Sequence, residues 1–276
     1  MNERELKKVL LVAGVLLTVM ITLGPVCYML ITALSETPDF LRPTKPLTLT
    51  LDHLLSVITA DTLHLLAYTR NSLLISAAAA IISVFLASLA AYALTRLPLP
   101  RKGFFLGGVL ALSMFPAISL VSYLFKLMAR LGWINTYPAL ILPYVAWTLP
   151  VSLWILVSYF AQVPRDLDHA GRIDGASRLQ ILVKIILPVA APGVFSTALL
   201  VFILAFNEFL FALMLTTDQA SRTIPVGIAL FEGLHGQIPW GEIMAAATIT
   251  TLPVIVLTLV FQRRLVQGLT RGAVKQ

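Results

Sequence analysis

The sequence predicts an all-α integral membrane protein with six transmembrane helices and a polar cytoplasmic loop between the fourth and the fifth. Of its 276 residues, 58% are hydrophobic and only 12% are charged, whereas a soluble globular protein carries roughly 25% charged residues. Six runs without Asp, Glu, Lys or Arg reach the length of about 20 residues that crosses a bilayer core. We therefore expect one polytopic domain over residues 1–276, with spans at 9–35, 71–95, 103–125, 137–163, 185–207 and 243–262.

The distribution of Lys and Arg predicts how these spans are oriented. Fourteen of the 20 basic residues fall in the two termini and in the loops 96–102 and 165–184, and six fall on the other side of the membrane. Cytoplasmic loops carry the excess of basic residues, so we expect both termini and the 165–184 loop in the cytoplasm. This topology accounts for the net charge of +7. Membrane lipid is therefore the expected surrounding, and no nucleic-acid partner is expected.

Prolines and one amphipathic stretch modify this plan at defined places. Pro116 falls inside the third expected span, and Pro143 and Pro150 fall inside the fourth; a proline removes a backbone donor and kinks a helix. Broken membrane helices occur around translocation paths, although an ordinary packing kink is an equal alternative. After the first span, a weakly amphipathic stretch that starts at Leu51 predicts a short helix along the outer surface.

The stretch DHAGRIDGASRLQ at 168–180 is a polar insertion between two apolar runs. Acidic residues favour the positive end of a helix dipole, so Asp166 and Asp168 predict a helix that begins near Pro164. Four residues of this helix would share one narrow face: Leu167, Ala170, Gly171 and Asp174. A short exposed helix of this kind fits the groove of a partner, and a plain solvated loop is the alternative.

Two signals predict a sharp corner after this helix. Gly175 can adopt the left-handed conformation that ends a helix. Ser177 and Gln180 fit the S-x-x-Q capping box that starts the next helix. Pro188 and Pro192 would then bend this second helix on its way back into the membrane. The loop is therefore expected to be a helix, a glycine corner and another helix.

At these residues the chain resembles a known family. The segment PRDLDHAGRIDGASRLQILVKIILPVAAPG (164–193) resembles the EAA loop of the permease subunits of binding-protein-dependent ABC importers, with Gly175 at the central glycine. His169, Ala170 and Gly171 stand where that family has E-A-A, so the glutamate charge is missing. Further segments resemble the six-span, maltose-type subunit of the carbohydrate-uptake branch: 70–103, 206–216, 224–231, 240–254 and 261–276.

The resemblance implies that the loop contains a coupling helix. This helix would dock in a cleft on an ATP-hydrolysing subunit, and closure of two such subunits would rock the permease between inward-facing and outward-facing states. The residues implied in docking are Leu167, His169, Ala170, Gly171, Asp174, Gly175, Ala176 and Ser177. Near the C-terminus, Gly272 and Lys275 are implied to approach the same ATPase.

The resemblance also implies the partners and the location. The chain would pair with a second homologous permease subunit and with two copies of an ATP-binding subunit in the inner membrane of a prokaryote. It would receive a sugar, either a disaccharide or an oligosaccharide, from an extracytoplasmic sugar-binding protein. The chain has no G-x-x-x-x-G-K-[ST] phosphate loop. We therefore expect no enzyme activity and no cofactor in this chain, with ATP and magnesium held by the partner.

Glu208 and its neighbour Asn207 are the polar residues expected at membrane depth. An acid there is costly and suggests a function, such as lining the translocation path or contacting another subunit; an interfacial carboxylate in reach of water is an equal alternative. The four histidines lack metal spacing and no catalytic pair is evident, so neither a metal site nor a catalytic residue is expected. An ion-coupled secondary transporter, and an ABC importer for glycerol phosphate or another polyol, stay open as alternatives.

Overall fold

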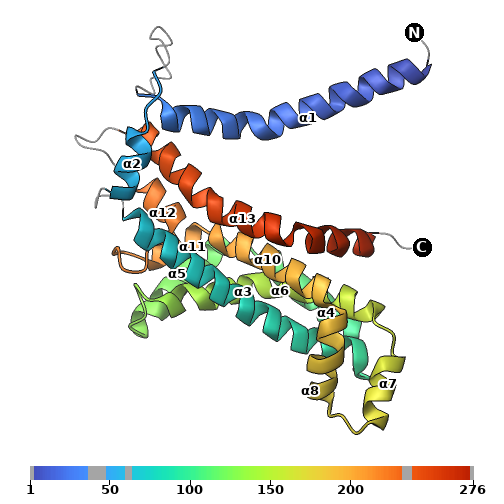
Figure 1. Ribbon diagram of the computed structural model, residues 1–276. Coiled ribbons are helices and arrows are strands. Elements are labelled where there is room, and N and C mark those ends of the chain that lie inside the picture. The colour runs from blue at the N-terminus through green and yellow to red at the C-terminus, as the bar shows by residue number, and fades with distance from the viewer. Residues whose placement is uncertain (1–2, 37–47, 60–63, 232–237, 274–276) are drawn as a thin grey trace. The chain divides into compact units, whose positions relative to one another are not determined.

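The computed structural model describes residues 3–36, 48–59, 64–231 and 238–273, and these residues are predominantly helical (Figure 1). Within these residues, two bent pairs of helices and four uninterrupted long helices are apolar enough to cross a membrane, which gives six spans when each pair counts as one. The long helices are α1 (Glu3–Leu34), α3 (Leu65–Arg96), α6 (Tyr137–Gln162) and α13 (Trp240–Ala273). The predicted all-α membrane fold is confirmed, but two of its spans are bent rather than straight.

The first bent pair consists of α4 (Lys102–Ser113) and α5 (Ala117–Arg130), which meet at 82°. Pro116 lies at the start of α5 with an extended backbone. Because proline has no amide hydrogen, it cannot continue the hydrogen-bond ladder of α4. The third expected span is therefore two helices of 12 and 14 residues, each shorter than the roughly 20 residues of a full crossing.

The second bent pair joins residues 178–189 to α10 (Ala191–Phe206) at 84°. Residues 178–189 form α8 (Arg178–Ile181), a π-helical turn (Leu182–Ile186) and α9 (Leu187–Val189). Pro192 falls in the first turn of α10, where no amide donor is needed, and the predicted bend is confirmed. Of the two alternatives left open for Pro143 and Pro150, a broken helix does not occur there, because α6 continues through both prolines.

The contacts divide the chain into two compact units, and the first consists of Met1–Leu66 with Gly227–Leu252. It contains α2 (Asp52–Thr59), the short helix expected after Leu51. His53 of α2 lies 3.3 Å from a carboxylate oxygen of Glu242 and 3.1 Å from the carbonyl oxygen of Ser35. The single polytopic domain over the whole chain stays a prediction.

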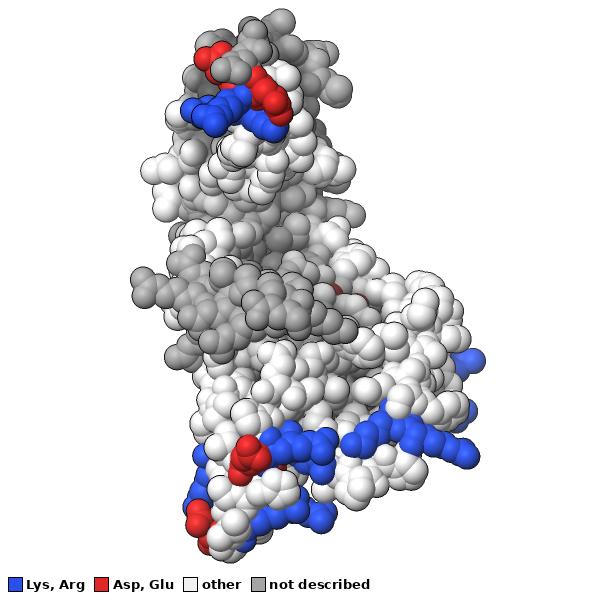
Figure 2. Space-filling model, turned by 90° about the vertical axis from the view of Figure 1, so that its right-hand side faces the viewer, with Lys and Arg blue, Asp and Glu red and all other residues white. Residues whose placement is uncertain are grey.

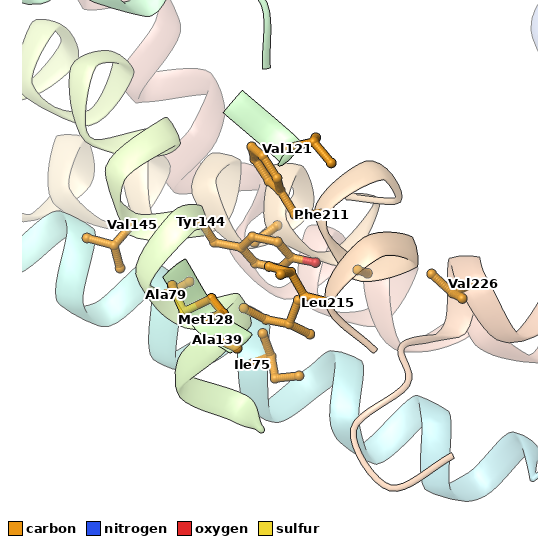
Figure 3. Packing of buried hydrophobic residues seen from close by; sticks show 13 residues of the cluster. Ile75, Ala79, Val121, Met128, Ala139, Tyr144, Val145, Phe211, Leu215 and Val226 are labelled. Carbon is orange, nitrogen blue, oxygen red and sulfur yellow. The ribbon is translucent and has the colours of Figure 1, made fainter. Parts of the chain in front are cut away.

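The second unit consists of Ala67–Val226 with Pro253–Gln276. The helix α12 (Ile224–Ala229) begins in the last residues of the first of these two stretches. One buried cluster lies where α6 meets α5 and α11 (Leu210–Leu215), and Figure 3 shows Tyr144 of α6 beside Phe211 and Leu215. A second cluster packs α3 and α6 against α8 and the π-helical turn. Because lipid is as apolar as these side chains, close packing rather than removal from water holds the helices together.

Candidate functional site

The 164–181 segment folds as the predicted helix, corner and second helix (Figure 1). α7 (Asp166–Ile173) is followed by Gly175, whose φ of +77° lies in the left-handed region that glycine adopts without strain. The Ser177 hydroxyl accepts the N–H of Gln180, and the Gln180 side chain accepts the N–H of Ser177. Both halves of the predicted capping box are therefore confirmed.

α7 has a buried side and an exposed side. Asp168 and Gly171 are buried, whereas Leu167 and Ala170 are exposed and Ile173 is 86% exposed. The single face predicted from helical spacing is therefore divided, because Gly171 turns toward the protein and Leu167 and Ala170 do not. Figure 2 shows Lys and Arg together with Asp and Glu around this end of the unit.

The other residues predicted for docking lie around the corner. His169, Asp174, Gly175 and Ser177 are exposed, and Ala176 is half-buried. Six of the eight predicted docking residues are thus open to a partner. The structure brings these six together on α7 and the corner that follows it.

Gly171 is enclosed by the chain's own residues. A methyl group at this position would lie 2.9 Å from Cδ1 of Ile185 and 3.1 Å from Cγ1 of Ile181. Both distances are shorter than the 3.5–4.0 Å of a relaxed carbon contact. The missing side chain therefore lets α7 approach α8 and the π-helical turn, and Gly171 serves the internal packing of the loop.

The buried carboxylate of Asp168 faces a cation on α3. Nε of Arg96 lies 3.0 Å from Oδ2 of Asp168, and both side chains are at most 5% exposed. The Nη2 atom of Arg96 donates to the carbonyl oxygen of Val163, at the end of α6, over 2.7 Å. Sequence reasoning missed Arg96 because α4, α5 and α6 separate it from the loop. Arg96 directly follows the charge-free run 71–95, and this position at the end of a span was the feature of the sequence that could have pointed to it.

Glu208 is buried at the junction between α10 and α11. Its carboxylate accepts the N–H of Phe211 at 2.8 Å and the N–H of Ala212 at 3.2 Å, two donors that the first turn of a helix leaves open. The hydroxyl of Tyr144 lies near this carboxylate but makes no hydrogen bond of ordinary geometry. The carboxylate thus has a structural task in holding the start of α11.

A polar network that the sequence did not suggest holds the residues after α11. The side-chain amide of Asn71 on α3 donates to the carbonyl oxygens of Ala220 and Arg222, both at 3.0 Å, and its oxygen accepts the Tyr137 hydroxyl at 2.6 Å. The neighbouring Ser72 accepts the first N–H of α12 at 2.8 Å. The 207–224 segment is therefore tied to the starts of α3 and α6.

The remaining predicted positions are separate from these two regions. Asn207 is exposed, and its side chain donates to the carbonyl oxygen of Ile203 in its own helix at 2.9 Å. Gly272 lies in the last turn of α13, and Lys275 lies outside the described residues. Within the parts of the chain that the structure describes, no group of three His, Cys, Asp or Glu residues is placed to hold a metal ion.

Comparison with known proteins shows which family this chain matches. Residues 83–271 match the family described as binding-protein-dependent transport system inner membrane component. The chain is 53% identical over 276 residues to the trehalose/maltose transport system permease protein MalG of Thermococcus litoralis, covering 100% of this chain and 99% of that protein. It is 43% identical over 231 residues to the trehalose transport system permease protein SugB of Mycobacterium tuberculosis, covering 83% and 84% respectively.

A solved structure shares the fold. The chain matches a chain of a bacterial ABC transporter involved in the import of the acidic polysaccharide alginate, with a TM-score of 0.77 and 19% sequence identity. The match covers 95% of this chain and 98% of that one. The bent helix pairs thus belong to a fold that occurs in a solved transporter.

Proposed function

This chain belongs to the inner-membrane components of binding-protein-dependent transport systems, the permease subunits of ABC importers, and we propose that it carries a disaccharide or a short oligosaccharide. Two relatives that are 53% and 43% identical, both named for trehalose transport, support this substrate class. The family is the non-catalytic, multi-pass membrane component, so ATP hydrolysis belongs to another subunit. Membership in this family sets aside the ion-coupled secondary transporter.

We propose that α7 is the helix that docks on the ATP-binding subunit. One observation carries this proposal: the outer side of α7 leaves Leu167, Ala170 and Ile173 exposed while its inner side is held by the chain itself. An exposed helix with apolar anchors fits a groove on a partner. The partner's groove would accept the imidazole of His169 at the position where related loops carry a glutamate.

The proposed assembly contains a second homologous permease subunit, two copies of an ATP-binding subunit and an extracytoplasmic sugar-binding protein. Both termini of this chain would then lie in the cytoplasm, in agreement with the excess of Lys and Arg there. Gly272 and Lys275 would approach the ATP-binding subunit from the C-terminal tail. All helices of the permease would contribute to one polytopic transmembrane domain.

The two polar residues proposed for the translocation path differ in what they offer. Glu208 already accepts two backbone donors of α11, so its carboxylate acts on the path through the position of that helix. Asn207 is exposed and binds only within its own helix among the contacts described. Its amide is therefore the group of this pair that is open to the sugar or to another subunit.

Co-purification in detergent tests the docking proposal. The wild type and an Ile173→Asp variant would be purified with a candidate ATP-binding subunit and a second permease subunit. Leu179→Asp is the matched control, since Leu179 is an exposed apolar residue of α8 outside the docking set. We expect the Ile173 variant to lose the ATP-binding subunit and the control to retain it. Equal retention in all three proteins would contradict docking through α7.

Substrate-stimulated ATP hydrolysis tests the proposed solute. The complete complex with its binding protein would be reconstituted in liposomes and assayed with trehalose, maltose, glycerol 3-phosphate and a sugar alcohol. We expect trehalose or maltose to stimulate hydrolysis and to accumulate inside. Stimulation by glycerol 3-phosphate or the sugar alcohol alone would replace the sugar with a polyol substrate.

A further inference from the structure

A single guanidinium group joins three helices beside the loop. Arg96 is the last residue of α3, and it contacts the carbonyl oxygen of Val163 after α6 and the carboxylate of Asp168 in the first turn of α7. Within the described parts of the chain, Asp168 makes no other ion pair. Among the described ion pairs, Arg96 is therefore the link between α7 and α3.

The pair is enclosed by protein, and its contact is a close approach of opposite charges without the geometry of a hydrogen bond. Arg96 and Asp168 are 4% and 5% exposed, so neither charge can exchange its partner for bulk water. Tyr92, one helical turn before Arg96 on the same face of α3, lies near the Asp168 carboxylate with its hydroxyl buried. Removing one partner of a buried pair leaves the other charge buried and uncompensated. A neutral side chain at either position would therefore weaken the contact between α3 and α7.

The two attachments of α7 lead to helices of different stiffness. Gly171 contacts Ile181 and Ile185, which continue into α10 through a π-helical turn and an 84° bend. Arg96 belongs to α3, an unbroken helix of 32 residues without Gly or Pro, about 48 Å long at 1.5 Å per residue. A displacement of α7 is therefore passed on with less bending through Arg96 than through Gly171.

The other end of α3 holds the 207–224 segment. Asn71 and Ser72 bind backbone groups at Ala220, Arg222 and Ile224. These bonds attach the end of the 207–224 segment to the same helix that carries Arg96. One rigid element thus contacts the docking helix at its C-terminal end and the 207–224 segment near its N-terminal end.

We propose that Arg96 is a positioning residue for transport, which transmits the movement of the docked α7 through Asp168 to α3 and from there to the 207–224 segment. This inference rests on the proposed docking role of α7. It assigns the mechanical link to the ion pair of Arg96 with Asp168 and to the unbroken helix α3. Loss of the pair leaves the exposed docking face of α7 intact and disconnects it from α3.

The test measures the amount of sugar transported per ATP hydrolysed in the complete complex with its binding protein, reconstituted in liposomes with labelled trehalose as the probe. The variants are Arg96→Ala, Arg96→Lys, Asp168→Asn, the charge-exchanged double variant Arg96→Asp with Asp168→Arg, and its two component single variants Arg96→Asp and Asp168→Arg. Lys102→Ala is the control, because Lys102 is a basic residue at the start of the next helix and makes no contact with α7 among the described ion pairs and hydrogen bonds. Retention of the ATP-binding subunit is measured in parallel.

We expect Arg96→Ala and Asp168→Asn to retain the ATP-binding subunit and to lower the transport ratio by roughly 2- to 30-fold, the range of coupling mutations. Lysine keeps the charge but cannot reach both Asp168 and Val163 in the same way, so Arg96→Lys should fall in between. The double variant should recover part of the ratio that each single variant loses, which a double-mutant cycle detects. A general loss of folding would not be rescued in this way.

Two outcomes would overturn the inference. One is a wild-type transport ratio in Asp168→Asn, which preserves the shape of the side chain and is the variant to use if Arg96→Ala does not insert. The other is a double variant that is no better than its single variants. Failure of the proposed function is distinguishable, because the wild type itself would then neither bind the ATP-binding subunit nor transport the probe.

Discussion

The 164–181 segment and the 207–224 segment both carry polar groups between apolar runs, and both use some of these groups to satisfy backbone groups, but they differ in what their other polar side chains contact. In the 207–224 segment, Glu208 and the contacts from Asn71 satisfy backbone groups of the chain itself. In the 164–181 segment, only Asp168 is committed to the interior, and residues such as His169 and Asp174 stay exposed. Polar groups thus support structure in the 207–224 segment, whereas the exposed polar side chains of the 164–181 segment are the ones that we propose for docking, and a set of substitutions can separate the two.

The largest loss of stability is expected in the 207–224 segment. Asn71→Leu keeps a similar volume and removes the hydrogen bonds to Ala220, Arg222 and Tyr137, at about 1–3 kcal/mol for each buried group left unsatisfied. Thermal unfolding in detergent should show a clear fall in Tm. Asn207→Ala is the control, since Asn207 is exposed. Equal Tm shifts in both variants would contradict the assigned network.

A smaller loss is expected at the corner of the 164–181 segment. Gly175 has a φ of +77°, and a methyl group there would meet nothing within 4 Å. Gly175→Ala should therefore cost only the backbone strain of about 1–2 kcal/mol. Gly132 has a φ of +69° with equally open space, so Gly132→Ala should cost the same in stability. Only the Gly175 variant should also weaken retention of the ATP-binding subunit, and equal retention in the two variants would remove the corner from the docking surface.

At Glu208 we expect a loss of stability similar to that caused by removing a helix N-cap. Glu208→Ala removes the acceptor of two α11 donors and should cost about 0.5–2 kcal/mol, as for other helix caps. Glu208→Gln keeps one acceptor oxygen and should cost less. At constant ATP, sugar uptake should be insensitive to proton uncouplers in the wild type and in both variants. An uncoupler-sensitive wild type that Glu208→Gln makes insensitive would instead give this carboxylate a role in proton transfer.

The smallest effect on stability is expected at His169. This residue is exposed on α7, and surface substitutions usually change stability by no more than about 0.5 kcal/mol. His169→Ala should therefore leave Tm unchanged and still weaken co-purification with the ATP-binding subunit. Lys126→Ala, an exposed change on α5, should alter neither quantity. A fall in Tm with full retention of the partner would place His169 with the structural residues.

Features that depend on a few neighbouring residues were predictable. The corner at Gly175, the capping box of Ser177 with Gln180 and the bend near Pro192 all appear where the sequence places them. Pro116 likewise ends one helix and starts another. Each of these features is decided within one helical turn, so the chain needs no distant partner to form it.

The sequence by itself determined that this is an all-α membrane protein with a short polar loop built as two helices and a corner, because length, hydropathy and capping act locally. Only the tertiary structure decided which side of α7 is buried and that Asp168 forms an ion pair with Arg96. It also decided that α6 continues unbroken through its prolines and that Glu208 holds a helix start. The physical reason is that burial and charge pairing depend on residues far apart in the chain, and helical periodicity carries no information about which neighbour will occupy the facing side.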